Sequence, residues 1–107
     1  MRGFDERQKA FEAEFQRNQE LAFRTAARRN RLFGLWAAKR LGVPDGDAAE
    51  DYARAVIAAD FTAPGNDDVI DKVRADFAAA NIDISEAELR AALVRMAVEA
   101  REQLAQS

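Results

Sequence analysis

The sequence contains no cysteine and no histidine among its 107 residues. Without cysteine, the chain has neither a disulfide bond nor a thiolate nucleophile. Without histidine, it lacks the commonest metal ligand, the commonest general base and the side chain that most often changes its charge near neutral pH. We therefore expect no metal site, and an enzyme is a weak hypothesis from the start.

The sequence also lacks an apolar run long enough to cross a membrane, because a spanning helix needs about 18 or more apolar residues in succession. Its first residues, MRGFDERQKAFEAEF, do not contain the apolar segment of a secretory signal peptide. Only two prolines and five glycines interrupt the chain. We expect a cytoplasmic protein that does not insert directly into a membrane.

The charged residues are unevenly distributed. Residues 1–41 hold ten Lys/Arg and five Asp/Glu, whereas residues 42–84 hold three and ten, and residues 85–107 hold three and four. A chain polarised in this way either steers toward a charged partner or packs its basic half against its acidic half. The overall charge of −3 argues against a nucleic-acid-binding protein, which would carry a basic domain.

Apolar residues recur with the period of amphipathic helices in four segments, and no strand-like alternation occurs. The segments extend from about residue 5 to 41, 48 to 61, 68 to 80 and 86 to 104. Because the connections between them are short, neighbouring helices are expected to be nearly antiparallel. The sequence therefore predicts an all-α protein, a four-helix bundle with a long first helix.

Residues at the expected helix boundaries favour the same division. The sequence TAPGN, residues 62–66, has the proline and glycine of a turn between the second and third helices. Asp47 with Glu50, and Ser85 with Glu88, have the spacing of capping boxes. These two pairs predict the starts of the second and fourth helices.

Each helix carries one apolar face that is expected to face its neighbours. In the first helix this stripe consists of Phe4, Phe11, Phe15, Ala22, Ala26, Phe33 and Ala37. In the other three it consists of Ala49, Tyr52, Ala53, Val56 and Ile57, of Val69, Ile70, Val73 and Phe77, and of Leu89, Ala92, Leu93, Met96, Ala97, Ala100 and Leu104.

The first twenty residues are unusually poor in apolar side chains. In DERQKAFEAEFQRNQE, residues 5–20, only Phe11 and Phe15 are large and apolar. Burying a phenylalanine contributes roughly 2 kcal/mol, whereas ordering the backbone of one residue costs roughly 1 kcal/mol. Even with Phe4 included, docking on its own bundle is not favoured. We therefore expect residues 1–20 to be mobile or partly disordered in the free protein, attached to a bundle formed by residues 21–107.

Two interpretations of this segment remain open. Its three phenylalanines lie on one helical stripe, as in a helix that folds into the groove of a partner. The alternative is a bundle helix that simply extends further toward the N-terminus.

The sequence ARRNRLFGLWAAKRLG is the most basic part of the chain. Arg24, Arg28 and Arg31 share one face of the helix, whereas Arg29 lies on the phenylalanine stripe. The aromatic residues have core spacing, so we interpret them as core and the arginines as a solvated or partner-facing surface. Gly34 costs about 1 kcal/mol in a helix interior, and its presence indicates that another backbone passes close.

Three stretches of the sequence resemble a known family: FDERQKAFEAEF, ARRNRLFGLWAAKRLG and DDVIDKVRADFAAANIDISEAELRAAL. They are similar, in order and over essentially the whole chain, to the zeta inhibitor subunits of alphaproteobacterial F-type ATP synthases. The resemblance implies a four-helix bundle without catalytic activity of its own. It implies inhibition of ATP hydrolysis, with the N-terminal segment inserted at an interface between the alpha and beta subunits beside the gamma subunit. Rotation in the hydrolysis direction would then be blocked, and synthesis largely permitted.

The resemblance also implies which residues carry the inhibition and where the protein acts. The inhibitory segment would contain Phe4, Asp5, Arg7, Ala10, Phe11, Glu12 and Phe15. We expect Phe4, Phe11 and Phe15 to be the apolar anchors, and Asp5, Arg7, Glu12 and Glu14 to pair at the rim. The protein would be a monomer when free and peripheral to the inner membrane through the enzyme. Histidine-based pH control, as in mitochondrial inhibitors, is not available to this sequence.

Other functions remain as alternatives. A nucleotide-sensing or assembly-assisting adaptor is the main one, in which Arg28, Arg29 and Arg31 would contact the phosphates of ADP or ATP. No other cofactor is expected. An enzyme is disfavoured because the sequence has no phosphate-binding loop, and acidic pairs such as Asp67 and Asp68 are typical of helix N-termini.

Overall fold

The computed structural model describes the backbone of residues 2–60 and 67–106 and, in these ranges, every side chain except those of residues 2–8 and Phe11. It contains four helices: α1 (Arg2–Leu41), α2 (Asp47–Ala59), α3 (Asp67–Ala79) and α4 (Glu86–Gln106). The described ranges contain no strand. The prediction of an all-α protein with a long first helix is therefore confirmed. The expected turn at 62–66 and the end of the second helix at residue 61 lie outside the described residues.

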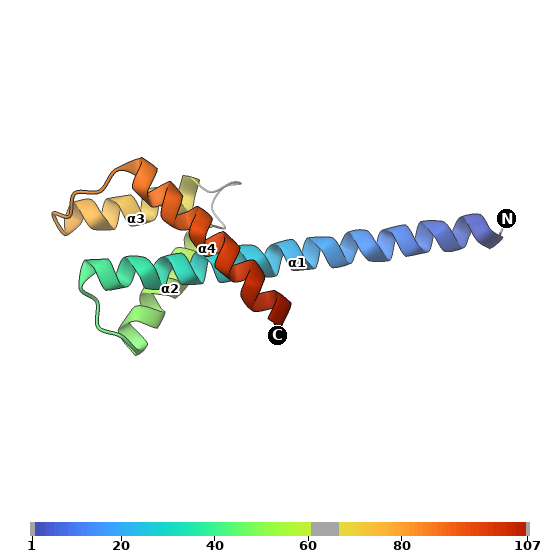
Figure 1. Ribbon diagram of the computed structural model, residues 1–107, viewed down its shortest axis with the longest axis horizontal. Helices are drawn as coiled ribbons and strands as arrows, with labels where there is room; N and C mark the ends of the chain where they lie inside the picture. Colours follow the sequence, from blue (N-terminus) through green and yellow to red (C-terminus); the bar gives the residue numbers. More distant parts are fainter. Residues whose placement is uncertain (1, 61–66, 107) are drawn as a thin grey trace.

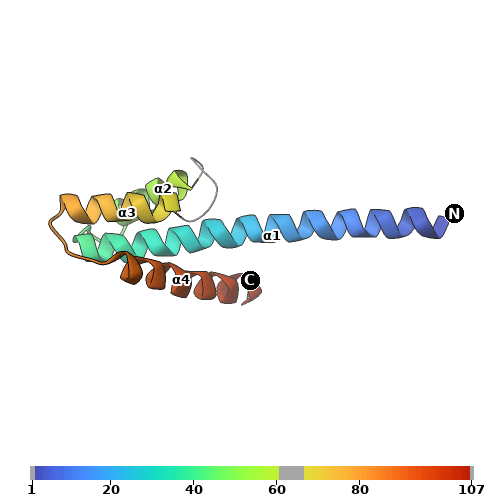
Figure 2. The same cartoon turned by 90° about the horizontal axis from the view of Figure 1, so that it is seen from above.

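The molecule consists of a bundle from which one helix projects. Its extents are 65 × 26 × 20 Å, and the long dimension comes from α1, whose N-terminal half extends far beyond the other helices (Figures 1 and 2). The C-terminal half of α1 packs chiefly against α2 and α4, and α3 completes the bundle. Neighbouring helices were expected to be nearly antiparallel, but Figure 1 shows α2 and α4 crossing α1 obliquely, whereas α3 lies along it.

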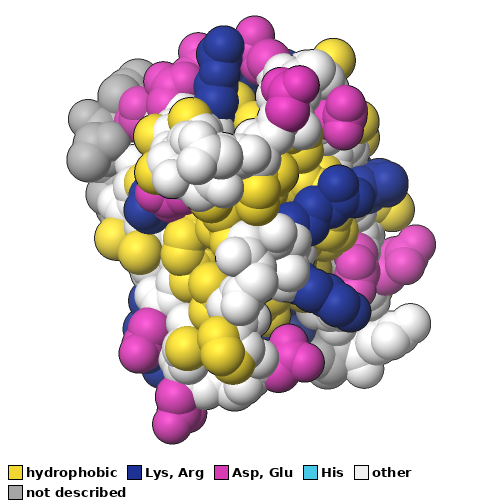
Figure 3. All heavy atoms as spheres, turned by 90° about the vertical axis from the view of Figure 1, so that its left-hand side faces the viewer, with side chains coloured by type: hydrophobic (Ala, Val, Ile, Leu, Met, Phe, Trp, Pro, Cys, Tyr) yellow, Lys and Arg dark blue, Asp and Glu magenta, His cyan; other side chains and the backbone are white. Residues whose placement is uncertain are grey.

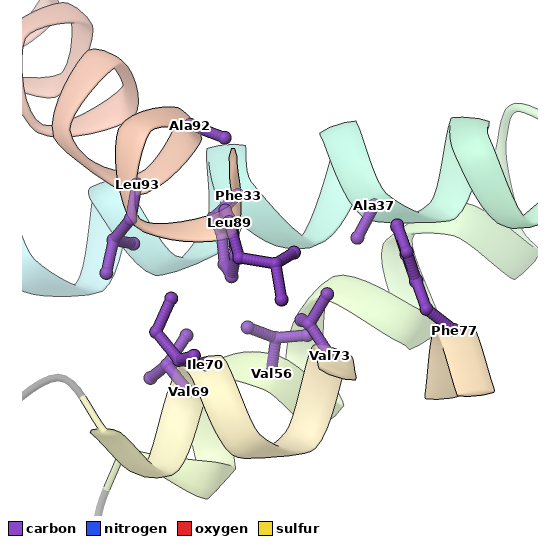
Figure 4. Close-up of a cluster of buried hydrophobic side chains, with 10 residues drawn as sticks. All are labelled: Phe33, Ala37, Val56, Val69, Ile70, Val73, Phe77, Leu89, Ala92 and Leu93. Carbon is purple, nitrogen blue, oxygen red and sulfur yellow. The ribbon is translucent and has the colours of Figure 1, made fainter. Parts of the chain in front are cut away.

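The core lies between the four helices at the C-terminal half of α1 (Figure 4). Phe33 of α1, Ile70 and Phe77 of α3, and Leu89 of α4 are fully buried there. Trp36 stacks between two of them, with its ring centroid 5.5 Å from that of Phe33 and 6.1 Å from that of Phe77. The faces predicted for α2, α3 and α4 are all buried or half-buried, because the 3.6-residue period alone fixes which side of a helix turns inward.

Gly34 marks the closest approach of two helices. A Cβ atom built on Gly34 would lie 2.8 Å from the Cα of Ala53 and 3.3 Å from the Cβ of Val56. Only glycine permits this contact between α1 and α2, which confirms the expectation of a nearby backbone.

The helix ends agree with the sequence at one predicted capping box and differ at the other. At α4, the backbone N–H of Glu88 donates to Oγ of Ser85 at 3.1 Å. At α2, the capping box predicted from Asp47 and Glu50 is wrong: Gly46 is the N-cap, no side chain caps it, and Asp47 is the first helical residue. The Glu50 carboxylate instead accepts a hydrogen bond from Arg31 at 2.6 Å.

The end of the bundle opposite the N-terminus is closed by the connections between helices. Figure 3 shows this face, where hydrophobic side chains lie in the middle and acidic and basic side chains surround them. Leu41, Ile82 and Ile84 are partly buried against the core. Within the described residues, no helix is long and apolar enough to cross a membrane.

Candidate functional site

The N-terminal half of α1 projects beyond the other helices (Figures 1 and 2). The side chains of residues 9, 10 and 12–20 are all exposed. Of the residues expected in the inhibitory segment, Ala10, Glu12, Glu14 and Phe15 belong to this exposed set. The backbones of Phe4, Asp5, Arg7 and Phe11 lie on the same helix, but their side chains are outside the described residues.

Phe15 and Phe33 show that one helical stripe has two environments. They are 18 residues apart, which is about five turns, so they lie on the same face of α1. Phe33 is fully buried, whereas 55% of Phe15 is exposed to solvent. Phe15 therefore presents apolar surface to solvent on the projecting part of α1.

Two further large apolar residues are exposed at the junction where α1 enters the bundle. Leu21 is 54% exposed and Phe23 is 60% exposed. Neither residue was singled out in the sequence, because both lie off the narrow phenylalanine stripe. Their signal is that large apolar residues interrupt a polar stretch immediately before the bundle begins.

A groove opens on the stripe side of this junction, between α1 and the C-terminal part of α4. Its volume is about 410 Å³. The lining residues are Asn18, Leu21, Ala22, Thr25, Ala26, Arg29, Ala97 and Arg101. The stripe that carries Phe15 therefore leads directly into a groove rather than onto a closed surface.

A second groove, of about 490 Å³, lies on the other side of α1. Phe23, Arg24, Ala27, Arg28 and Arg31 of α1 line it together with Ile57 of α2 and Leu104 of α4. We call it the basic groove. In it, Arg28 donates to Oε1 of Gln103 at 3.3 Å, and Arg31 pairs with Glu50. The three arginines predicted to share a face do so.

Arg29 is turned away from the basic groove. Its Nε donates to Oδ1 of the buried Asn30 at 3.0 Å, and its guanidinium lies 3.9 Å from the carboxylate of Asp60. Burial lowers the pKa of Arg29, and the nearby charge of Asp60 acts in the opposite direction. Arg29 thus links α1 to the C-terminal end of α2, whereas the pair of Arg31 with Glu50 links α1 to the first turn of α2.

The three arginines considered as nucleotide contacts are therefore not brought together. Arg28 and Arg31 line the basic groove, while Arg29 lines the groove on the stripe side. In the part of the chain that the structure describes, no group of three or more carboxylate side chains could hold a metal ion. The described surface offers exposed apolar side chains and two grooves.

Comparison with known proteins agrees with this surface. A model of the family described as ATPase inhibitor subunit zeta matches residues 1–103. A protein whose solution structure was determined by NMR is 42% identical; the match covers 78% of this chain and 94% of that one, with a TM-score of 0.69. No curated protein matches the chain. The chain belongs to the ATPase inhibitor subunit zeta family, whose members are inhibitor subunits that bind the ATP synthase and not enzymes themselves.

Proposed function

We propose that this chain inhibits ATP hydrolysis by an F-type ATP synthase through insertion of its N-terminal segment, residues 1–20. The segment enters a catalytic interface between an alpha and a beta subunit, beside gamma, and stops rotation in the hydrolysis direction. The bundle of residues 21–107 stays outside and anchors it. The observation that carries this proposal is the projecting half of α1, which is exposed over residues 9, 10 and 12–20.

The shape of the segment supports insertion into a cleft. A single α-helix with side chains is about 10–12 Å across, so it fits between two subunits where a bundle does not. Its described side chains are all exposed, so little internal packing is lost on insertion. The enzyme would supply the apolar surroundings that the bundle does not give to Phe15.

The roles within the segment follow from residue type. Phe4, Phe11 and Phe15 are the apolar anchors, and Asp5, Arg7, Glu12 and Glu14 pair with charged groups at the rim. Ala10 leaves room for a close approach of the enzyme. Anchors of this kind carry most of the binding free energy at protein interfaces, and rim charges carry less.

The test measures ATP hydrolysis by a purified F-type ATP synthase stripped of its own inhibitor. The full chain is titrated beside a version that lacks residues 1–19. Inhibition by the full chain alone would support the proposal and assign inhibition to the segment. Absence of inhibition by either protein would contradict it and favour an adaptor. Parallel ATP-synthesis assays check that the block acts in one direction.

A point variant sharpens the test without removing the segment. Phe15→Ala is expected to cost about 2–4 kcal/mol of binding, which raises the half-inhibitory concentration about 30- to 700-fold. Val94→Ala is the matched control, because Val94 is an exposed apolar residue of α4 outside the segment. Equal inhibition by the two variants would remove Phe15 from the anchors.

A further inference from the structure

The basic groove begins where the inhibitory segment ends. Phe23 and Arg24 line the groove and follow residue 20 by less than two helical turns. On the proposed function, the enzyme covers α1 up to about residue 20. The same enzyme surface must therefore pass close to the groove, so the groove extends that interface.

The charge of the groove selects its occupant. Glu50 neutralises Arg31, and Arg28 is held by the uncharged Gln103. Arg24 is exposed and forms no ion pair with any described residue. The groove thus keeps an excess of positive charge, which favours carboxylates.

The walls of the groove favour a protein surface over a phosphate. Phe23, Ile57 and Leu104 make part of the lining apolar. The α1 residues of the groove lie in the middle of a 40-residue helix, so their backbone N–H groups already donate hydrogen bonds within the helix. They therefore do not give a phosphate the free N–H groups that a helix N-terminus would provide. A protein surface with an apolar side chain flanked by carboxylates would pack against these apolar walls and pair with the arginines.

We propose that the basic groove docks an acidic surface element of the ATP synthase, one that presents an apolar side chain next to carboxylates beside the cleft that receives residues 1–20. This proposal rests on the proposed function for its choice of partner. Docking at this groove steers the bundle to the enzyme and holds it while the segment inserts.

The experiment measures association and dissociation of full-length protein on immobilised, inhibitor-stripped ATP synthase at several salt concentrations. Arg24→Glu is expected to lower the association rate about tenfold at low ionic strength, with the difference shrinking as salt screens it. Phe23→Ala is expected to speed dissociation. The matched control is Arg95→Glu, which makes the same charge change at an exposed arginine of α4 outside the groove.

The outcomes separate this proposal from the proposed function. With the segment intact, Arg24→Glu should still reach the parent's full inhibition at saturating concentration. Equal association rates for Arg24→Glu and Arg95→Glu would overturn docking at the groove, as would Arg24-dependent binding of ADP or inorganic phosphate in an NMR titration. The parent chain could instead bind the enzyme at a rate that Arg24→Glu lowers, yet fail to inhibit hydrolysis. That result would support docking at the basic groove and contradict inhibition by the inserted segment.

Discussion

Residues 9–20 and residues 28–41 form two halves of one continuous helix, and they differ in what surrounds them. The second half is covered by α2, α3 and α4 and supplies Phe33 to the core. In the first half every described side chain is exposed. Most helical stability in proteins comes from packing of an apolar face. Packing against other helices therefore stabilises α1 at its C-terminal half, and the described side chains of residues 9–20 lack such burial.

The largest difference between the halves should appear in amide hydrogen exchange. Amides of residues 28–41 open only with the bundle, at a cost of about 5 kcal/mol or more, which slows exchange by several thousandfold. Amides of residues 9–20 are expected to exchange with little protection in the free protein. Mass-spectrometric or NMR exchange measures both at once. Equal protection in the two halves would contradict the predicted mobility of residues 1–20.

Two phenylalanine truncations on the same stripe give the next largest contrast. Phe33→Ala should lower the free energy of unfolding by about 3–5 kcal/mol, because it leaves a cavity in the core. Phe15→Ala should change it by less than about 0.5 kcal/mol, as expected for an exposed site. Urea unfolding followed by circular dichroism measures both. A comparable loss in the two variants would mean that Phe15 packs within the free protein.

A substitution at Gly34 tests whether helix propensity or the contact between α1 and α2 has the larger effect on the stability of the bundle. Glycine to alanine in an exposed helix interior stabilises by about 1 kcal/mol. Gly34→Ala should instead destabilise by about 1–3 kcal/mol, because the new Cβ would meet the backbone of Ala53. Thermal unfolding distinguishes the two signs, and a stabilised variant would show that α2 moves away freely.

The smallest effect concerns a polar contact within the bundle. The hydroxyl of Tyr52 donates to Oδ2 of Asp76 at 2.8 Å, and burial, followed by this hydrogen bond, raises the tyrosine pKa. Tyr52→Phe should cost about 1 kcal/mol at neutral pH. Since the folded-state pKa lies above the unfolded value of about 10, this stabilisation is present below that pH and is lost as the pH rises through the folded-state pKa.

A pair of pH titrations checks the assignment to Tyr52. The parent protein should lose stability above about pH 10, and Tyr52→Phe should lose less over the same interval. Identical pH profiles for the two proteins would mean that a group other than Tyr52 causes the loss of stability at alkaline pH.

Much of the bundle could be predicted from the sequence because helical periodicity is a local property. The buried faces of α2 to α4 follow from apolar spacing, and the cap at Ser85 and the close approach at Gly34 follow from residue chemistry. The start of α2 could not be predicted in the same way. Asp47 and Glu50 have the spacing of a capping box, but Glu50 is drawn to Arg31, a partner that only the fold brings near.

The candidate site divides in the same manner. The exposed stripe with Phe15 was visible as a shortage of apolar residues in the first twenty positions. The two grooves were not, because they depend on how α4 lies against α1. Arg28, Arg29 and Arg31 are neighbours in sequence, yet the helix directs Arg29 to the opposite groove. Helical spacing already separated Arg29 from Arg28 and Arg31 in the sequence, but only the packing of α2 and α4 against α1 shows that a groove lies on each side.

The continuity of α1 through the junction fixes a phase between the two ends of the molecule. Each residue of an α-helix turns the chain by about 100° and advances it by 1.5 Å. One residue inserted between Leu21 and Arg24 would rotate the phenylalanine stripe by about 100° around the helix axis relative to the basic groove. Seven inserted residues would return the stripe to within about 20° of its original bearing and displace it by about 10 Å along the axis. On the proposed function, the number of residues between the stripe and the basic groove would therefore set together the angle of the bundle on the enzyme and the depth of the segment in the cleft.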